Sequence, residues 1–251
     1  MPDRKLNADS NTIDYVLNTY SNYIDNLQII ELNNLLLKDK HHYGERTVRN
    51  IISSVLQLII DECGSDIVNN LEVPHQSIWG YYLNVVFDDH VDIRRDIADN
   101  EFAGAKFNNG VTVQSKKLPD GALGSTYMNG IVDLTNVVEL GGFNLNYADD
   151  SDCYVTVKLS KDLKKIDCFL FATRFRNSNI VVEYSGTVSE FNDMVFENIL
   201  QWPESSKIRF DTLLGTAPSI RCLDGDWRHS VFKRDQRYNI EWTKLIQNNY
   251  R

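Results

Sequence analysis

Two acidic residues with metal-ligand chemistry, Asp167 and Glu183, lie in the segment IDCFLFATRFRNSNIVVEYSG (166–186). Apolar and polar residues alternate on both sides of RNSN, a sequence that tolerates a tight turn, so the segment predicts a β-hairpin. We expect the hairpin to carry both acids to one edge. Two carboxylates about 5 Å apart at one edge would repel each other, so such a pair implies a metal ion, a basic neighbour or a shared proton. The alternative is that both acids are outward members of a solvated hairpin.

The elements around this pair have a recognisable order. Strands are expected at 153–159, 166–175 and 180–188, a helix from about Ser189 to Trp202, and a further strand at 207–214. This order over residues 153–214 resembles the core of the PD-(D/E)xK nuclease superfamily. The resemblance implies that Asp167, which opens the second strand, and Glu183, in the third, are catalytic residues that hold Mg²⁺. The ion would polarise a phosphodiester and supply hydroxide near neutral pH.

At one position the sequence departs from the motif of that family. A lysine is expected two residues after the acid of the third strand, and Ser185 stands there instead. The lysine would position the attacking water, so Ser185 leaves open whether the site is active or degenerate. Arg174 and Lys158 are the candidates to replace it.

A second acidic group lies in FDDHVDIRRDIAD (87–99), where Asp88, Asp89, His90 and Asp92 are close in sequence. Carboxylates with a histidine suit a first-row metal, and a small-molecule hydrolase would be the matching function. The spacing matches no known ligand pattern, however, and Arg94 and Arg95 can neutralise the acids locally. A solvated acidic run is therefore the preferred interpretation.

Charge is distributed unevenly along the chain. The 251 residues have a formal charge of −9, which argues against a general nucleic-acid coat, but residues 204–251 hold 9 basic and 6 acidic residues. We expect any contact with nucleic acid to be made there, by Arg228, Lys233 and Arg234, with aromatic neighbours available for stacking. The alternative is a solvated loop that packs through Trp227.

Helical spacing of apolar residues begins near Thr12 and recurs from about Glu45 to Glu62, where Cys63 and Gly64 end the second helix. Farther along, alternation predicts strands at 77–87 and 111–113, and Asn239–Tyr250 reads as a closing helix. No internal repeat is evident. The sequence therefore predicts an α+β fold: a helical layer (1–73) packed on a mixed or mainly antiparallel sheet region (74–251), together one compact unit.

The functional expectation follows from these parts. The sequence predicts a cytoplasmic, nuclease-like subunit that acts on nucleic acid within a larger assembly with a protein partner. The alternative is a non-catalytic protein–protein interaction subunit, with a docking face on its long N-terminal helix and no role with nucleic acid. No membrane contact is expected, because no apolar run is long enough to span a bilayer. Four widely spaced cysteines suit reduced thiols in the cytoplasm.

Overall fold

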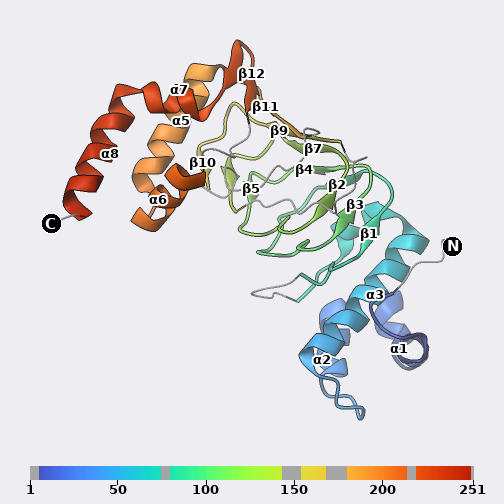
Figure 1. The fold of residues 1–251 in the computed structure, drawn as a ribbon. Coiled ribbons are helices and arrows are strands. Elements are labelled where there is room, and N and C mark those ends of the chain that lie inside the picture. Colours follow the sequence, from blue (N-terminus) through green and yellow to red (C-terminus); the bar gives the residue numbers. More distant parts are fainter. Residues whose placement is uncertain (1–5, 75–79, 143–153, 168–179, 214–218, 250–251) are drawn as a thin grey trace.

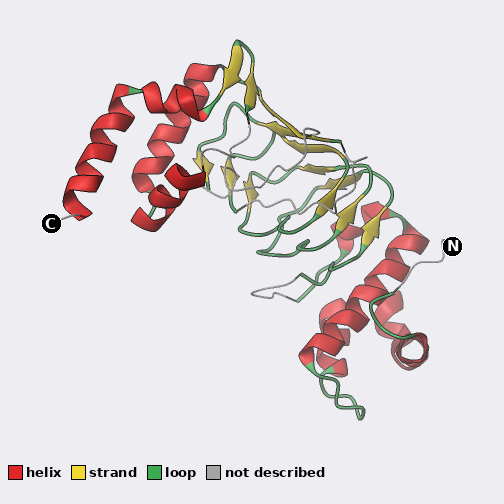
Figure 2. Ribbon diagram, in the orientation of Figure 1, coloured by secondary structure: helices red, strands yellow, loops and turns green. Residues whose placement is uncertain are grey.

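A stack of short strands with helices at both ends makes up the protein (Figures 1 and 2). The computed structural model describes residues 6–74, 80–142, 154–167, 180–213 and 219–249. The helices are α1 (Ser10–Asp25), α2 (Ile29–Leu36), α3 (Glu45–Cys63), the 3₁₀ helix η1 (Ser65–Asn70), α5 (Val188–Gln201), α6 (Glu204–Leu213), α7 (His229–Arg234) and α8 (Gln236–Asn249). The strands are β1 (Val86–Phe87), β2 (Val91–Ile93), β3 (Lys106–Phe107), β4 (Val111–Val113), β5 (Lys117–Leu118), β6 (Tyr127–Met128), β7 (Gly130–Leu134), β8 (Glu139–Leu140), β9 (Val155–Leu159), β10 (Lys165–Ile166), β11 (Ile180–Tyr184), β12 (Ile220–Cys222) and β13 (Gly225–Trp227).

The strands form three sheets. The long sheet has the order β13-β12-β11-β9-β7-β4-β2, and two smaller sheets have the orders β1-β3-β6 and β10-β8-β5. Among the described strands, β12 and β13 pair antiparallel and every other pair is parallel. The α+β class and the mixed sheet are confirmed. The sheets are mainly parallel, not mainly antiparallel.

The chain winds through these sheets in successive coils, so the architecture is a β-solenoid. One coil contributes β3, β4 and β5, and the next contributes β6, β7 and β8, each to a different sheet. In the long sheet, equivalent residues are 20, 21, 25 and 25 positions apart, as the register of Val91, Val111, Val132, Val157 and Val182 shows. The expectation of no internal repeat was wrong. The repeat is one of spacing, with few identical residues.

Ladders of apolar side chains fill the inside of the coils. Inward positions stack on their equivalents in the next coil. In the long sheet one such ladder, with side chains at most 1% exposed, is Val91, Val111, Val132, Val157, Val182 and Ile220. On the β1 side the rings of Phe87 and Phe107 stack at 4.9 Å. The buried side chains of the helices join the same core. Burial of these ladders is the main stabilising term of the fold.

Glycine is required at one corner between coils. Gly110 has φ +82°, and a Cβ at this position would lie 2.1 Å from the backbone oxygen of Ile131 in the next coil. Only a residue without a side chain permits both this left-handed conformation and the close approach of the next coil.

Helices α3 and η1 cover the first coil and complete the hydrogen bonds of its open edges. The Gln57 amide accepts from the N–H of Val86 (2.7 Å) and donates to its carbonyl (3.1 Å). The Asn69 amide donates to the carbonyl of Asp92 (2.9 Å) and accepts from the N–H of Arg94 (2.7 Å). A neighbouring strand would use the same backbone groups, so each amide side chain replaces one residue of a missing strand.

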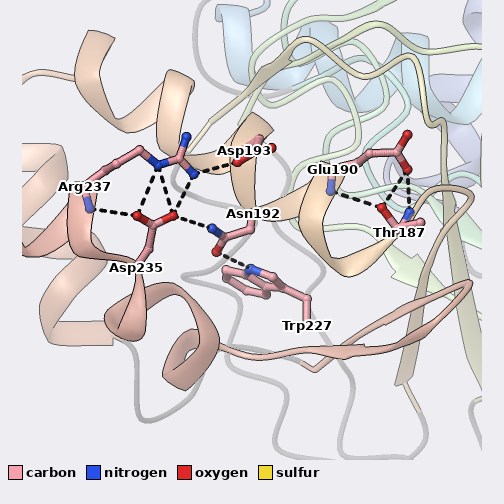
Figure 3. Close-up of polar contacts among 7 residues, drawn as sticks. All are labelled: Thr187, Glu190, Asn192, Asp193, Trp227, Asp235 and Arg237. Carbon is pink, nitrogen blue, oxygen red and sulfur yellow. Dashed lines mark hydrogen bonds and ion pairs between the residues drawn. The ribbon is translucent and has the colours of Figure 1, made fainter.

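Helix α5 covers the edge of the small sheet at the other end of the stack. It begins at Thr187, which forms a capping box with Glu190 (Figure 3). From its buried face, Asn198 accepts from the N–H of Ile166 (3.0 Å) and donates to the carbonyl of Lys164 (2.8 Å). This amide again replaces a strand residue, here beside β10.

Three sequence expectations have clear outcomes. The helices near 12 and 45–62 are confirmed, and Gly64 ends α3 with φ +84°. The strand expected at 77–87 is wrong for its described part except at Val86 and Phe87, because residues 81–84 form a turn. The strand expected at 207–214 is also wrong, since α6 extends over this segment to Leu213. Short apolar runs fit both the helical period and the alternation of a strand, and tertiary packing decides which of the two forms.

Replacing the capping amide should destabilise the protein measurably. We expect Asn198→Leu, which keeps the side-chain size but leaves two backbone groups of β10 without these partners, to lower the free energy of unfolding by about 2–4 kcal/mol. Urea denaturation followed by circular dichroism measures this. Glu197→Gln on the exposed side of α5 is the control and should change it by less than about 0.5 kcal/mol. Equal stability of Asn198→Leu and wild type would mean that the cap contributes nothing.

Candidate functional site

Asp167, the first predicted metal ligand, directly follows β10. Its backbone N–H donates to the carbonyl of Leu140 (3.0 Å), which fixes it beside the neighbouring strand β8. The residue is partly exposed and lines a pocket between the β10-β8-β5 sheet and α5. Glu183 is not among the residues that line this pocket.

Glu183, the second predicted ligand, lies on the outer face of the long sheet. Its carboxylate forms an ion pair with Arg221 on β12 (3.1 Å), and Lys158 occupies the equivalent position on β9. Lys158, a candidate to replace the missing lysine, is thus a direct neighbour of Glu183. Ser185 has a structural role, since its hydroxyl donates to the carbonyl of Leu159 (2.8 Å) and accepts from the N–H of Lys161 (3.1 Å).

The described strands on either side of the predicted turn do not form a hairpin. β10 pairs with β8, whereas β11 pairs with β9 on one edge and with β12 on the other, all in parallel. In their described parts the two segments therefore do not pair as a hairpin: Asp167 follows β10 of the small sheet, and Glu183 lies in β11 of the long sheet. The turn RNSN and the candidate Arg174 lie outside the described residues.

Charged residues alternate along one row of the long sheet. The row, read from β2 to β13, is Asp92, Thr112, Asp133, Lys158, Glu183, Arg221 and Asp226. Strands lie about 4.8 Å apart, so Lys158 and Arg221 each have an acid on both sides. The row holds four acids and two bases, and its outer acids pair with arginines outside the row: Asp92 with Arg94 (3.6 Å) and Asp226 with Arg228 (3.4 Å). Exposed ion pairs are screened by water and salt, so the row stabilises the strand register only modestly. Both of its cations already have acidic neighbours.

The acidic run near residue 90 is dispersed into contacts with the neighbouring coil. His90 contacts the carbonyl of Asn109 through Nδ1 (3.0 Å) and the hydroxyl of Thr112 through Nε2 (2.9 Å). Asp88 accepts from Asn108 (2.9 Å). Both ring nitrogens of His90 are thus engaged, which supports a structural role. Among the described residues, no three His, Cys, Asp or Glu side chains come together in a way that could hold a metal ion.

The basic C-terminal segment is folded onto α5. Arg228 begins α7, and Lys233 and Arg234 lie in its last turn with exposed side chains. Arg228 contacts Asp226 at 3.4 Å. These three residues remain the predicted contacts to nucleic acid. Trp227 is fully buried, in agreement with the alternative that this segment packs through its tryptophan.

Arg237 is the centre of an acidic network next to this segment (Figure 3). It pairs with Asp235 (2.7 Å) and with Asp193 of α5 (2.6 Å). Asn192 donates to Asp235 (2.9 Å) and accepts from the indole N–H of Trp227 (3.3 Å). The hydrogen bonds from Arg237 are the main reason that the pKa of Asp235 lies below its usual value, and they outweigh the opposing effect of burial. The network fastens α8 to α5.

A buried carboxylate that the sequence analysis missed lies among the N-terminal helices. Asp39 accepts from the hydroxyls of Tyr15 and Tyr20 and from the backbone and ring nitrogens of His41. Burial alone would raise the pKa of Asp39, but these hydrogen bonds hold it well below its usual range. Four contacts occupy both carboxylate oxygens. Because Tyr15 and Tyr20 belong to α1 and Asp39 lies in the loop after α2, the cluster joins these two elements. Its only sequence signal was an acid followed by a histidine.

The pocket at Asp167 is the candidate functional site. Its volume is about 390 Å³. The small sheet and the turns beside it contribute charged side chains, α5 contributes two amides, and Trp202, directly after α5, contributes an indole. These lining residues are Asp99, Lys117, Asp120, Glu139, Lys165, Asp167, Asn198, Gln201 and Trp202. Sequence reasoning found Asp167 and missed the rest, because the coils bring together residues about 20 and 25 positions apart.

Comparison of the chain with protein-family models, with curated proteins and with solved structures gave no match. Within the part of the chain that the structure describes, none of the helices has the length and apolar character needed to cross a bilayer.

Substitution of the two predicted ligands tests whether they act together. Because Asp167 follows β10 of the small sheet and Glu183 lies in β11 of the long sheet, we expect Asp167→Ala and Glu183→Ala not to remove the same Mg²⁺-binding event in titration calorimetry. A Mg²⁺ site lost in both variants, together with nuclease activity that depends on both acids, would instead support the nuclease interpretation.

The Asp235 network makes a pH-dependent contribution to stability. The folded-state pKa of Asp235 is depressed, so its contribution is complete above the ordinary aspartate pKa of about 3.9 and is lost as the pH falls through the folded-state value. We expect Asp235→Asn to be less stable than wild type at pH 7 and the difference to shrink below about pH 4. Urea unfolding at a series of pH values measures it. A difference that stays constant down to acid pH would contradict this cause.

Proposed function

We propose that this protein is a non-catalytic interaction subunit that docks a partner protein through its C-terminal helices. The observation that carries the proposal is the exposure of large apolar side chains there: Leu200 on α5, Ile208 on α6 and Ile240 on α8 are 45%, 49% and 56% exposed. Single exposed apolar residues are common, but several on adjacent helices are typical of an interaction surface.

A groove of about 250 Å³ between α5, α6 and α8 supports a specific docking mode. Its apolar lining includes Leu200, Trp242 and Leu245. Its rim carries two ion pairs, Glu204–Lys207 (3.2 Å) on α6 and Glu241–Lys244 (2.8 Å) on α8. An apolar floor inside a polar rim is the usual anatomy of a protein interface.

The charge pattern of the rim indicates the kind of partner. Each rim pair is neutral and has its acid three residues before its lysine, so the groove favours neither a strongly acidic nor a strongly basic segment. An amphipathic helix with an apolar stripe and both charges on its flanks fits this chemistry. It would lie in the groove between α5, α6 and α8 and would complete a small bundle.

The N-terminal helices offer less apolar surface than the sequence predicted. The apolar residues of α1 pack into the core, as Ile13 and Val16 do, or against it, as Leu17 and Ile24 do. The docking face expected on this helix is therefore replaced, in this proposal, by the groove at the opposite end of the molecule (Figure 1).

The nuclease-like function, the Mg²⁺ cofactor and the cytoplasmic location stay predictions of the sequence. The described geometry does not favour the nuclease-like function. Asp167 follows a strand of the small sheet, Glu183 lies in the long sheet, and α6 takes the place of the fourth strand of the expected order.

A charge in the groove should abolish docking. We expect Leu200→Asp to weaken partner binding at least tenfold, because it places a carboxylate where apolar surface would be buried. Leu37→Asp, at a residue 42% exposed beyond α2, is the matched control and should bind normally. Proteins that co-purify with wild type but not with Leu200→Asp are identified, purified and titrated against all three forms by calorimetry.

Three outcomes of that experiment are informative. Thermal unfolding should be the same for both variants, since both positions are exposed. Partners retained by Leu200→Asp, or lost equally in Leu37→Asp, would contradict docking in the groove. Wild-type dimers in sedimentation velocity that dissociate in Leu200→Asp would mean that a second copy of the chain occupies it.

A further inference from the structure

The pocket beside Asp167 is separate from the docking groove, and its shape is the first reason to consider it a binding site. Its volume of about 390 Å³ falls in the range of about 300–1,000 Å³ that small-molecule sites occupy. The small sheet β10-β8-β5 forms one side, and the end of α5 with the start of the following link forms the other.

The sheet contributes a fixed row of charges to this pocket. Lys117, Glu139 and Lys165 are paired in register on β5, β8 and β10, and all three side chains are exposed. With strands about 4.8 Å apart, Glu139 has a lysine on each side. The row therefore offers ammonium donors beside a carboxylate acceptor, a combination suited to hydroxyl groups.

Further carboxylates follow where these strands end and where the preceding coil turns. Asp120 accepts from the N–H of Gly142 (2.9 Å), so the next coil holds its position. Asp99 and Asp167 line the same pocket. Together with the row on the sheet, the described lining residues hold four carboxylates and two ammonium groups, a formal charge of −2 at neutral pH.

Helix α5 supplies a rigid aromatic wall. The indole N–H of Trp202 donates to the carbonyl of Ile166 (3.0 Å), and its ring packs edge-to-face on Phe210 at 5.4 Å. The cap that Asn198 places on β10 holds the same helix turn in position. The wall is thus set before a ligand arrives, which lowers the entropy cost of binding.

We propose that this pocket binds a monosaccharide-sized polyol and prefers one that carries an ammonium group. Carboxylates and lysines exchange hydrogen bonds with hydroxyl groups, and an indole packs on the apolar C–H face of a sugar ring. The excess of carboxylates attracts a cation and repels an anion.

Three sugars with the same ring size and different charge test the proposal: D-glucosamine, D-glucose and D-glucuronate. The full chain is titrated with each, and binding is followed by saturation-transfer NMR and by tryptophan fluorescence. We expect affinity to fall in the order glucosamine, glucose, glucuronate, and added salt to reduce the preference for glucosamine. Asp99→Asn should weaken glucosamine binding by about two- to fivefold and leave glucose binding nearly unchanged.

Glu197→Gln, which removes a charge from the exposed face of α5 outside the pocket, is the matched control and should bind all three sugars as wild type does. Saturable binding of none of the sugars, tighter binding of glucuronate, or an equal loss in Asp99→Asn and Glu197→Gln would overturn the proposal. Leu200→Asp should bind the sugars normally, so failure of the docking groove and failure of this pocket are distinguishable.

Discussion

The open edges of the parallel strands are the constraint on which the rest of the structure depends. A parallel solenoid leaves unpaired N–H and C=O groups on its first and last coils, and these groups would invite pairing with another chain. Here three amide side chains pair with six of these groups: Gln57 at β1, Asn69 at β2 and Asn198 at β10. Because each amide comes from a packed helix, the helices must sit where they do. The buried side chains of the helical ends and of the sheets belong to a single core.

Between the helices at the two ends of the solenoid, alternate residues of each strand have different roles: inward residues stabilise the fold, and outward residues set the chemistry of the surface. Inward positions repeat small β-branched residues, such as Val111 and Val132, that stack coil upon coil. Outward positions repeat polar ones, and on the long sheet acids and bases lie side by side from strand to strand. Both bases of that row, Lys158 and Arg221, therefore have an acid on each side. The features that could recognise a ligand lie instead where the solenoid meets its C-terminal helices: the pocket beside Asp167 and the groove around Leu200 and Trp242.

The predicted active site shows how local reasoning fails in such a fold. Asp167 and Glu183 were placed together because two alternating segments around a turn-forming sequence usually pair with each other. In a solenoid, the neighbour of a strand is the equivalent strand one coil away. β11 therefore pairs with β9 and β12, and Glu183 has Lys158 and Arg221 as its neighbours. For the same reason the pocket could not be predicted from the sequence, because its lining residues, such as Lys117 and Glu139, become adjacent only when successive coils stack.

The sequence by itself determined what depends on short-range periodicity and composition. The helix ending at Gly64, the strands around Val111 and Val157, the burial of Trp227 and the α+β class all follow from residues within a few positions of one another. Tertiary structure alone decided what depends on register between distant segments. These are the parallel pairing, the capping amides, the helix over 204–213 in place of a strand, and the meeting of Asp99, Glu139 and Asp167 at one pocket. The physical reason is that a repeat of 20 to 25 residues is set by how coils stack their apolar ladders, and no local propensity encodes that distance.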